Sequence, residues 1–285
     1  MILEKFIVFF DYLAHTWEKR GTQRTLGLLL FLIYLVSLCA IGLNNAGLYP
    51  AILLDKLPHP PHSHFASIHL AFTLILIMEL VSLIFIIPSS ISTAIAKQFE
   101  ILTLILLRNA FKELTALEEP VRISMENIDS LTTIIVSALG AVAVFLCLGI
   151  YRRIACKKHF IIDHEERRHY IMAKKVIAFV LLILFIIVGV DDLLADQTTL
   201  SKSFFETIYT ILIFADIAVV LVSQCYMTGY YAVFRNSGFV MGTLLMRLSL
   251  SAPPLWSPAI GLVAALFVIL LTWETNRYIE FTEKQ

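Results

Sequence analysis

Charged residues inside apolar segments of membrane-spanning length are the feature that most limits what this chain can fold into. In residues 69–108, Glu79 stands in one apolar run, a turn of small residues follows, and Lys97 and Glu100 stand in the next run. A charge at the centre of a bilayer costs about 2.5–3.5 kcal/mol even on a lenient insertion scale. These residues therefore favour a membrane protein whose helices enclose a polar interior.

Residues 206–247 repeat this order. Asp216 stands in an apolar run, a turn follows at Gly229, and Arg235 stands in the next run. Glu79 and Asp216 are 137 residues apart, and the arginines that end the two stretches, Arg108 and Arg247, are 139 apart. The similarity predicts two halves that are built alike.

The composition excludes a soluble globular protein. Hydrophobic residues make up 59% of the 285 residues, charged residues only 15%, and the mean hydropathy is +0.83. The formal net charge is zero, so nucleic acid is not an expected partner. The four cysteines lie far apart, and neither a disulfide framework nor a zinc site is indicated.

We expect an all-α polytopic membrane protein with about eight transmembrane helices in two four-helix repeats. The first repeat covers residues 25–151 and the second 176–278, with a cytoplasmic basic hinge at 152–175 between them. Residues 1–24 are too short and too charged to span a bilayer, which needs about 20 apolar residues. Their apolar residues have helical spacing, so we expect an amphipathic helix in the membrane interface.

The number of spans depends on residues 91–107 and 230–250, which carry the internal charges. If both cross, there are eight helices in two parallel repeats; if neither does, there are six in two inverted repeats. Cytoplasmic loops are enriched in Lys and Arg. Eight spans place 14 of the 22 basic residues on the inner side and six on the outer side, whereas six spans turn the hinge outward. Eight spans, with both termini cytoplasmic, are favoured.

The hinge is a dense group of cations that we expect to face the cytoplasm. Such a segment attracts anionic lipid or an acidic protein surface. The alternative to a transport function, a membrane anchor or scaffold subunit of a larger complex or oligomer, depends on this group. Its members are Arg152, Arg153, Lys157, Lys158, Arg167, Arg168, Lys174 and Lys175.

Glu79, Lys97 and Glu100 are expected to meet inside the bundle. With a rise of about 1.5 Å per residue, the three lie at similar depth, and Lys97 and Glu100 share one helix face. Asp216 and Arg235 are expected to form a smaller counterpart in the second half. Structural ion pairs and a transport site look the same in sequence, so both interpretations stay open at this point.

A four-helix unit with an acid midway along its second helix and another early in its third resembles a voltage-sensor domain. The order AKQFEIL resembles the start of that family's third helix, with Glu100 where the family has an acid. Residues 131–150 and 258–273 lack the family's arginine ladder, and no TVGYG-like filter follows either half. The resemblance implies a shared scaffold present twice, and not voltage sensing.

Histidines gather in the proline-rich stretch before the second apolar segment. His59, His62, His64 and His69 have spacings that suit a metal, but such a sequence more often forms an extended loop with solvated histidines. We expect no metal and no cofactor.

Three classes of function follow from these patterns. The first is movement of ions or protons through the helix-bundle core by Glu79, Lys97, Glu100, Asp216 and Arg235. The second is the anchor or scaffold. The third, an enzyme acting on lipid or quinone, has no supporting motif, and GxSxG, P-loop and GxGxxG motifs do not occur, so no enzyme is predicted. The expected location is the cell (inner) membrane.

Overall fold

The computed structural model describes residues 2–46, 63–114, 127–155, 164–194, 202–226 and 229–282, and all regular structure in these ranges is helical. The all-α prediction is confirmed to that extent. The helices are α1 (Ile2–Glu18), α2 (Arg20–Asn45), α4 (Phe65–Ile86), α5 (Ile91–Leu114), α6 (Ile128–Ile154), α7 (His164–Leu194), α8 (Lys202–Tyr226), α9 (Tyr230–Ser251) and α10 (Ser257–Thr282).

Six of these helices are long and apolar enough to cross a membrane: α2, α4, α6, α7, α8 and α10. Apart from α1, the helices have 22 to 31 residues, which corresponds to about 33–46 Å at 1.5 Å per residue. The hydrocarbon core of a bilayer is about 30 Å thick. The protein is therefore a multi-pass membrane protein by the length and composition of its helices.

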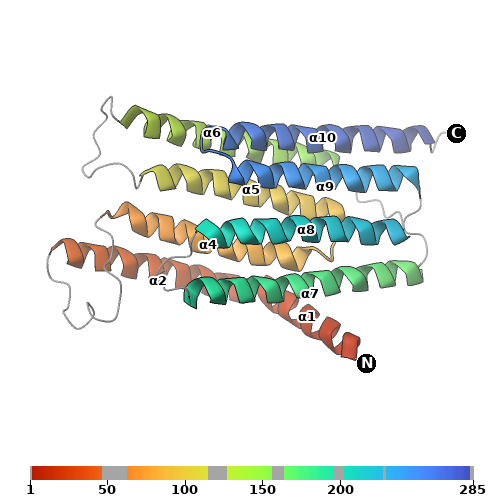
Figure 1. Ribbon diagram of the computed structural model, residues 1–285, viewed down its shortest axis with the longest axis horizontal. Coiled ribbons are helices and arrows are strands. Elements are labelled where there is room, and N and C mark those ends of the chain that lie inside the picture. Colours follow the sequence, from red (N-terminus) through yellow and green to blue (C-terminus); the bar gives the residue numbers. More distant parts are fainter. Residues whose placement is uncertain are drawn as a thin grey trace.

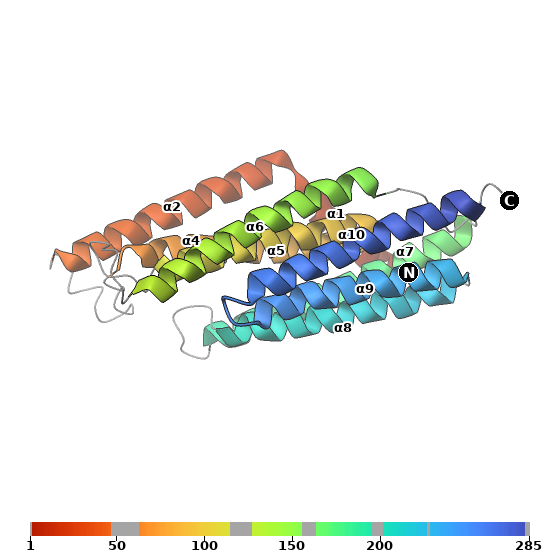
Figure 2. The ribbon, with the colours of Figure 1, turned by 90° about the horizontal axis from the view of Figure 1, so that it is seen from above.

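The helices other than α1 run side by side in two layers (Figures 1 and 2). In one layer the packing order is α2, α4, α5, α6, and in the other it is α7, α8, α9, α10. The layers touch where α6 meets α10, where α5 meets α9, and where α4 meets α7. Each layer thus consists of four consecutive described helices in chain order.

Both chain termini lie at the same end of the bundle, on the right in Figure 1. We call this the terminal end; it also holds the α4–α5 turn and the beginning of α7. The opposite end holds the C-terminal ends of α5 and α9 and the N-terminal ends of α4 and α8 (Figure 1). The long helices alternate in direction between the two ends.

The α5 helix belongs to both hydrophobic cores. One core lies between α4, α5, α7 and α8, and the other between α5, α6, α9 and α10. From α5, Ile101 and Ile105 enter the first core and Phe99, Leu102 and Leu106 enter the second. Side chains leave a helix about 100° apart, so one helix can supply two faces to two cores.

Glycines allow helices to approach closely, both between the layers (α6 and α10) and within one layer (α9 and α10). A Cβ atom on Gly140 of α6 would lie 2.3 Å from Cβ of Pro258 in α10, and one on Gly242 of α9 would lie 2.3 Å from Val268 Cγ2. Small residues at helix contacts are the usual means of bringing membrane helices together. The small-residue pattern around Gly140 therefore lies at a helix–helix contact.

The α1 helix crosses the bundle obliquely and packs against α2 and α7 (Figure 1). Phe10 is buried in the first core, and Trp17 Nε1 donates a hydrogen bond to Ser82 Oγ of α4 at 2.9 Å. Residues 2–18 are helical, as expected, whereas α2 already begins at Arg20, within the range 1–24 assigned to the interfacial segment. Its position in the membrane interface stays a prediction.

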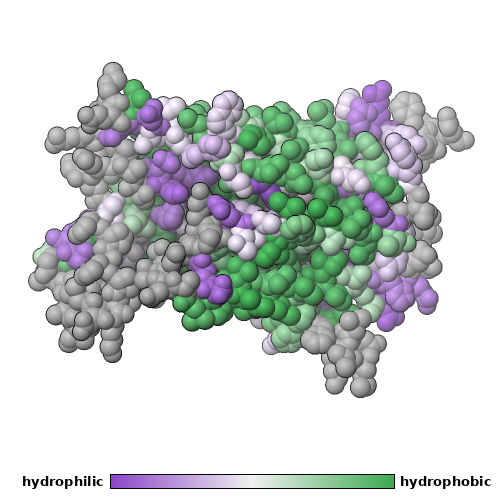
Figure 3. Space-filling view, viewed as in Figure 1, coloured by the Kyte–Doolittle hydropathy of each residue, from purple (hydrophilic) through white to green (hydrophobic). Residues whose placement is uncertain are grey.

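Apolar side chains form a broad band over the middle of the bundle, and hydrophilic residues gather toward its ends (Figure 3). Large apolar residues of α2, α6 and α7 are exposed, among them Leu32, Phe145 and Ile186. A surface of this kind suits hydrocarbon and not water.

We predict that Gly140→Ala destabilises the protein while Gly149→Ala, on the same helix, does not. The new methyl group at position 140 overlaps the rigid Pro258 ring, and overpacking of this kind costs about 1–3 kcal/mol. Gly149 has no atom within 4 Å of a Cβ position. Thermal unfolding in detergent measures both, and equal midpoints for the two variants would contradict the close α6–α10 contact.

Candidate functional site

Lys97 of α5 lies between two carboxylates. Its Nζ contacts Glu79 Oε2 of α4 and lies 3.1 Å from Glu100 Oε2, one turn along α5. Arg152, at the end of α6, contacts the other oxygen of Glu100. The structure thus brings Glu79, Lys97 and Glu100 together, as the sequence predicts, and links α4, α5 and α6 near the terminal end.

The second half has a different ion pair from the one expected. Asp216 Oδ2 of α8 accepts a hydrogen bond from Arg247 Nη2 of α9 at 2.6 Å, and the Arg247 side chain is only 3% exposed. The expected partner, Arg235, instead has its guanidinium 6.0 Å from the centre of the Phe239 ring. Arg235 lies three turns from Arg247 on α9 and close to the terminal end, too far along the helix to share that carboxylate.

Lys174 is the largest departure from the sequence prediction. It was expected among the exposed cations of the hinge, but it is 2% exposed inside the bundle. Its Nζ donates to the backbone carbonyl of Ser89 in the α4–α5 turn and lies 5.1 Å from the centre of the Tyr170 ring. A buried ammonium held by a carbonyl, with no carboxylate contact among the described residues, is expensive to desolvate.

Most of the hinge is helical. The helix α6 continues to Ile154, and α7 already starts at His164, so Arg167, Arg168, Lys174 and Lys175 belong to a helix. Arg152, Arg153 and Arg168 are exposed, and Lys175 pairs with Asp11 of α1 at 2.7 Å. Lys157 and Lys158 lie outside the described residues.

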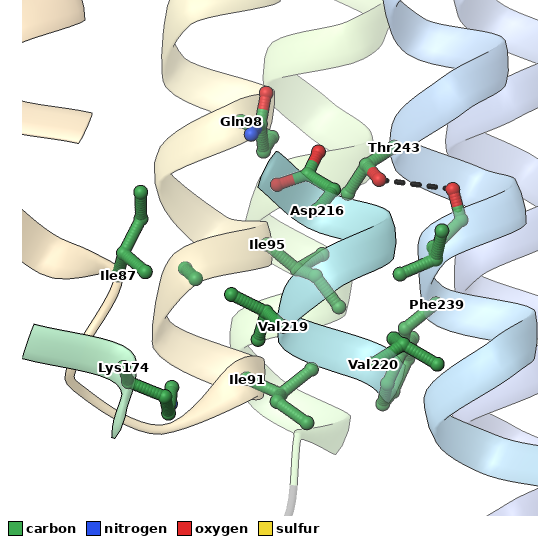
Figure 4. A pocket seen from close by; sticks show the side chains of 12 residues that line it. Ile87, Ile91, Ile95, Gln98, Lys174, Asp216, Val219, Val220, Phe239 and Thr243 are labelled. Atoms are coloured by element: carbon green, nitrogen blue, oxygen red, sulfur yellow. Dashed lines mark hydrogen bonds between the residues drawn. The ribbon is translucent and has the colours of Figure 1, made fainter. Parts of the chain in front are cut away.

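A cavity lies between the layers, between Lys174 at one end and Asp216 at the other (Figure 4). Gln98 and Thr243 gather beside Asp216, and aliphatic residues such as Ile95 and Val219 line the middle. Its volume is about 50 Å³. A water molecule needs about 10–15 Å³ by this measure, so roughly three to five fit.

Beyond the Asp216–Arg247 pair, the polar residues continue toward the opposite end. Tyr209 of α8 lies within electrostatic range of both Arg247 and Arg108. Arg108 of α5 stacks over the Phe205 ring, with its Cζ 4.8 Å from the ring centre. His69 of α4 lies in turn near Arg108.

These residues form a polar track between the layers that extends toward both ends of the bundle and is interrupted by the aliphatic lining of the cavity; its members lie on α4, α5, α7, α8 and α9. The Glu79–Lys97–Glu100 cluster lies to one side and does not line the cavity. The polar track consists of Lys174 near the terminal end, of Gln98, Asp216 and Thr243 in the middle, and of Arg247, Tyr209, Arg108 and His69 toward the opposite end.

Sequence reasoning did not select several members of the track. Gln98, Tyr209 and Thr243 are ordinary polar residues, and Arg108 and Arg247 were noted only as the ends of the repeated stretches. A signal was present for two of them, because Gln98 and Thr243 lie on helices that already carry charges.

The candidate histidine site is not among the described residues. His59 and His62 fall outside them, and His64 directly precedes α4. No group of three metal-binding side chains occurs in the part of the chain that the structure describes. No protein-family model, curated protein or solved structure matches this chain.

We predict that Lys97→Met lowers the unfolding temperature more than the double variant Glu79→Gln with Lys97→Met. Removing one member of a buried pair costs about 3–5 kcal/mol, and less here because the carboxylates are partly exposed, whereas removing both partners avoids an unpaired charge. Lys175→Met is the control, since its half-exposed partner Asp11 makes a pair that contributes about 0–1 kcal/mol. Equal unfolding temperatures for Lys97→Met and Lys175→Met would show that Lys97 reaches the interface instead.

Proposed function

We propose that the protein moves protons or small ions across a membrane along the polar track between its two layers. The observation that carries this proposal is that the buried Asp216–Arg247 pair borders a cavity large enough for water, with Lys174 at the cavity's other end. This differs from the sequence prediction in its location, since the track runs between the halves and not through the core of each.

The alternative is a purely structural role for the buried charges. Well-packed apolar residues of similar size often stabilise a protein as well as a buried ion pair does. A pair that only joins α8 to α9 also gains nothing from a neighbouring cavity, because every empty volume lowers stability. Ionisable groups inside membrane segments face water-filled cavities in proteins that move ions. The position of Asp216 therefore favours transport.

The proposal includes eight crossings in two four-helix repeats. It is supported by the shared packing order of the two layers and by the direction in which α5 and α9 turn their polar residues. Asn236, Thr243, Arg247 and Ser249 of α9 are all buried, whereas Phe234, Met241 and Leu248 are exposed. A helix with a polar inner face and an apolar outer face can lie at membrane depth. The voltage-sensor resemblance stays a prediction.

An anchor or scaffold is the second candidate function. The helix α2 favours it, because among the described helices it packs mainly against α1 and α4 and it exposes Leu28, Phe31, Leu32 and Val36. Such a face suits another transmembrane helix as well as it suits lipid, and the exposed arginines at the terminal end suit anionic lipid. In this case the polar track would only hold the layers together.

Single cysteines test the eight crossings, in a variant without the four native cysteines. Ser63→Cys and Asn127→Cys, which flank α4 and α6 at the opposite end, should react with an impermeant thiol reagent from outside the cell. Ser90→Cys and Arg153→Cys, at the terminal end, should react only after permeabilisation, because the sequence predicts that 14 of the basic residues belong to the cytoplasmic side. Ser90 and Asn127 flank α5, so labelling of both from the same side would mean that α5 does not cross.

Ion flux into liposomes tests transport itself. We expect the purified wild-type protein to dissipate an imposed ion gradient. The double variant Asp216→Asn with Arg247→Gln should fold, because it removes both partners of the pair, but should lose at least about tenfold of the flux, equivalent to about 1.4 kcal/mol in the barrier.

The matched control for this double variant is Glu79→Gln with Lys97→Met, which removes the ion pair outside the track. It should keep the wild-type rate. Wild-type protein without flux in any of the salts tried, or a folded Asp216→Asn, Arg247→Gln protein with full flux, would reject the track as an ion path and leave the scaffold.

A further inference from the structure

The interior of the bundle has more positive than negative groups. Among the described side chains that are buried or half-buried, and leaving aside the last turn of each helix and Lys175, which pairs with the exposed Asp11, five cations and three carboxylates lie within the helix bundle. The cations are Lys97, Arg108, Lys174, Arg235 and Arg247, and the carboxylates are those of Glu79, Glu100 and Asp216.

The imbalance is concentrated in the polar track. Two of the three carboxylates, Glu79 and Glu100, contact Lys97 outside the track. The track itself contains Lys174, Arg247 and Arg108 but only one carboxylate, that of Asp216. A cation entering it would meet like charges in a medium of low dielectric, where repulsion is several times stronger than in water.

Unused hydrogen-bond donors mark the part of the track near the opposite end. Nε of Arg108, Nε of Arg247 and Nε2 of His69 are buried without a hydrogen-bond partner among the described residues. Buried polar atoms are nearly always hydrogen-bonded in folded proteins, so unsatisfied ones call for an explanation. Here they belong to neighbouring side chains, since Tyr209 interacts with both arginines and His69 with Arg108.

The depth of these residues suits an entry site. His69 is four residues from the start of α4, Arg108 six from the end of α5, and Arg247 four from the end of α9. At about 1.5 Å per residue these side chains start roughly 6–9 Å inside the bundle. Arg108 and Arg247 therefore lie at a similar depth, and an ion arriving from the opposite end meets both before it reaches Asp216, which is 14 residues from the start of α8.

We propose that the ion carried by this protein is a small monovalent inorganic anion, bound first by Arg108 with His69 and Tyr209. This rests on the proposed transport function and adds the class of ion. The anion replaces Asp216 as the partner of Arg247, because both are anionic and the guanidinium has spare donors. It then passes through the cavity to Lys174, whose ammonium is held only by the Ser89 carbonyl and the Tyr170 ring.

Binding is measured on the purified protein in detergent, with no need for transport. Sodium nitrate and sodium chloride are titrated against sodium gluconate at constant ionic strength, and the unfolding temperature is followed. We expect saturable stabilisation by nitrate and chloride relative to gluconate, since a ligand that binds only the folded state raises its stability. Arg108→Gln should raise the midpoint of this titration, the anion concentration that gives half of the full stabilisation, at least about tenfold, or about 1.4 kcal/mol.

Two further variants keep this measurement decisive. Tyr209→Phe retains the ring and should raise the midpoint several-fold, which gives a reading even if Arg108→Gln fails to fold. Arg153→Gln removes an exposed arginine at the terminal end and should leave the midpoint unchanged. The absence of saturable stabilisation, or equal midpoints in the wild type, Arg108→Gln and Tyr209→Phe, would overturn the anion site.

Flux in liposomes separates this inference from the proposed function. With potassium chloride and potassium gluconate on opposite sides, an anion path gives a reversal potential set by chloride. A reversal potential set by potassium or by protons would overturn the anion proposal while leaving transport intact. Anion-dependent stabilisation without any flux would retain the binding site and reject transport.

Discussion

The rest of the structure depends on the need to give every charge inside an apolar medium a partner. The α5 helix meets this need in three directions: Lys97 and Glu100 face α4 and α6, Gln98 faces the cavity, and Arg108 reaches the ring of Phe205 on α8. None of these contacts is possible for an isolated helix in lipid. Because α5 also contributes to both hydrophobic cores, its polar and apolar contacts fix the same arrangement of the two layers.

The two halves satisfy their charges in different ways. In the first half, three helices share an acid–base cluster in which the side chains of Lys97, Glu79 and Glu100 are 16% to 31% exposed. In the second half, a single pair joins α8 to α9, with Arg247 3% exposed and Asp216 18% exposed toward the cavity. A partly exposed network near one end is held largely by local contacts, whereas a pair inside the bundle needs the opposing layer to exclude lipid and water. The similarity in sequence order therefore does not extend to the chemistry of the pairs.

Sequence reasoning succeeded where spacing along one helix decides the outcome. Lys97 and Glu100 are three residues apart, and the arithmetic of helix rise brought Glu79 to the same depth. It failed where the rotation of one helix against another decides. Lys174 and Lys175 are adjacent in sequence, yet 100° of rotation puts the first inside the bundle and the second against Asp11. Asp216 likewise pairs with Arg247 and not Arg235, which depends on how α8 and α9 are aligned lengthwise.

The polar faces of α5 and α9 also explain why the two layers belong together. These two helices are absent from the six that are apolar enough to span alone, and they meet each other between the layers. The α5 helix covers polar groups of α9, and α9 covers polar groups of α5. Without this contact these groups would face hydrocarbon, where every unsatisfied group costs several kcal/mol. The close contact at Gly140 holds the layers together where α6 meets α10, whereas the cavity lies between α5, α7, α8 and α9. Movement of one layer against the other would therefore pivot near Gly140 and change the space around Asp216 most.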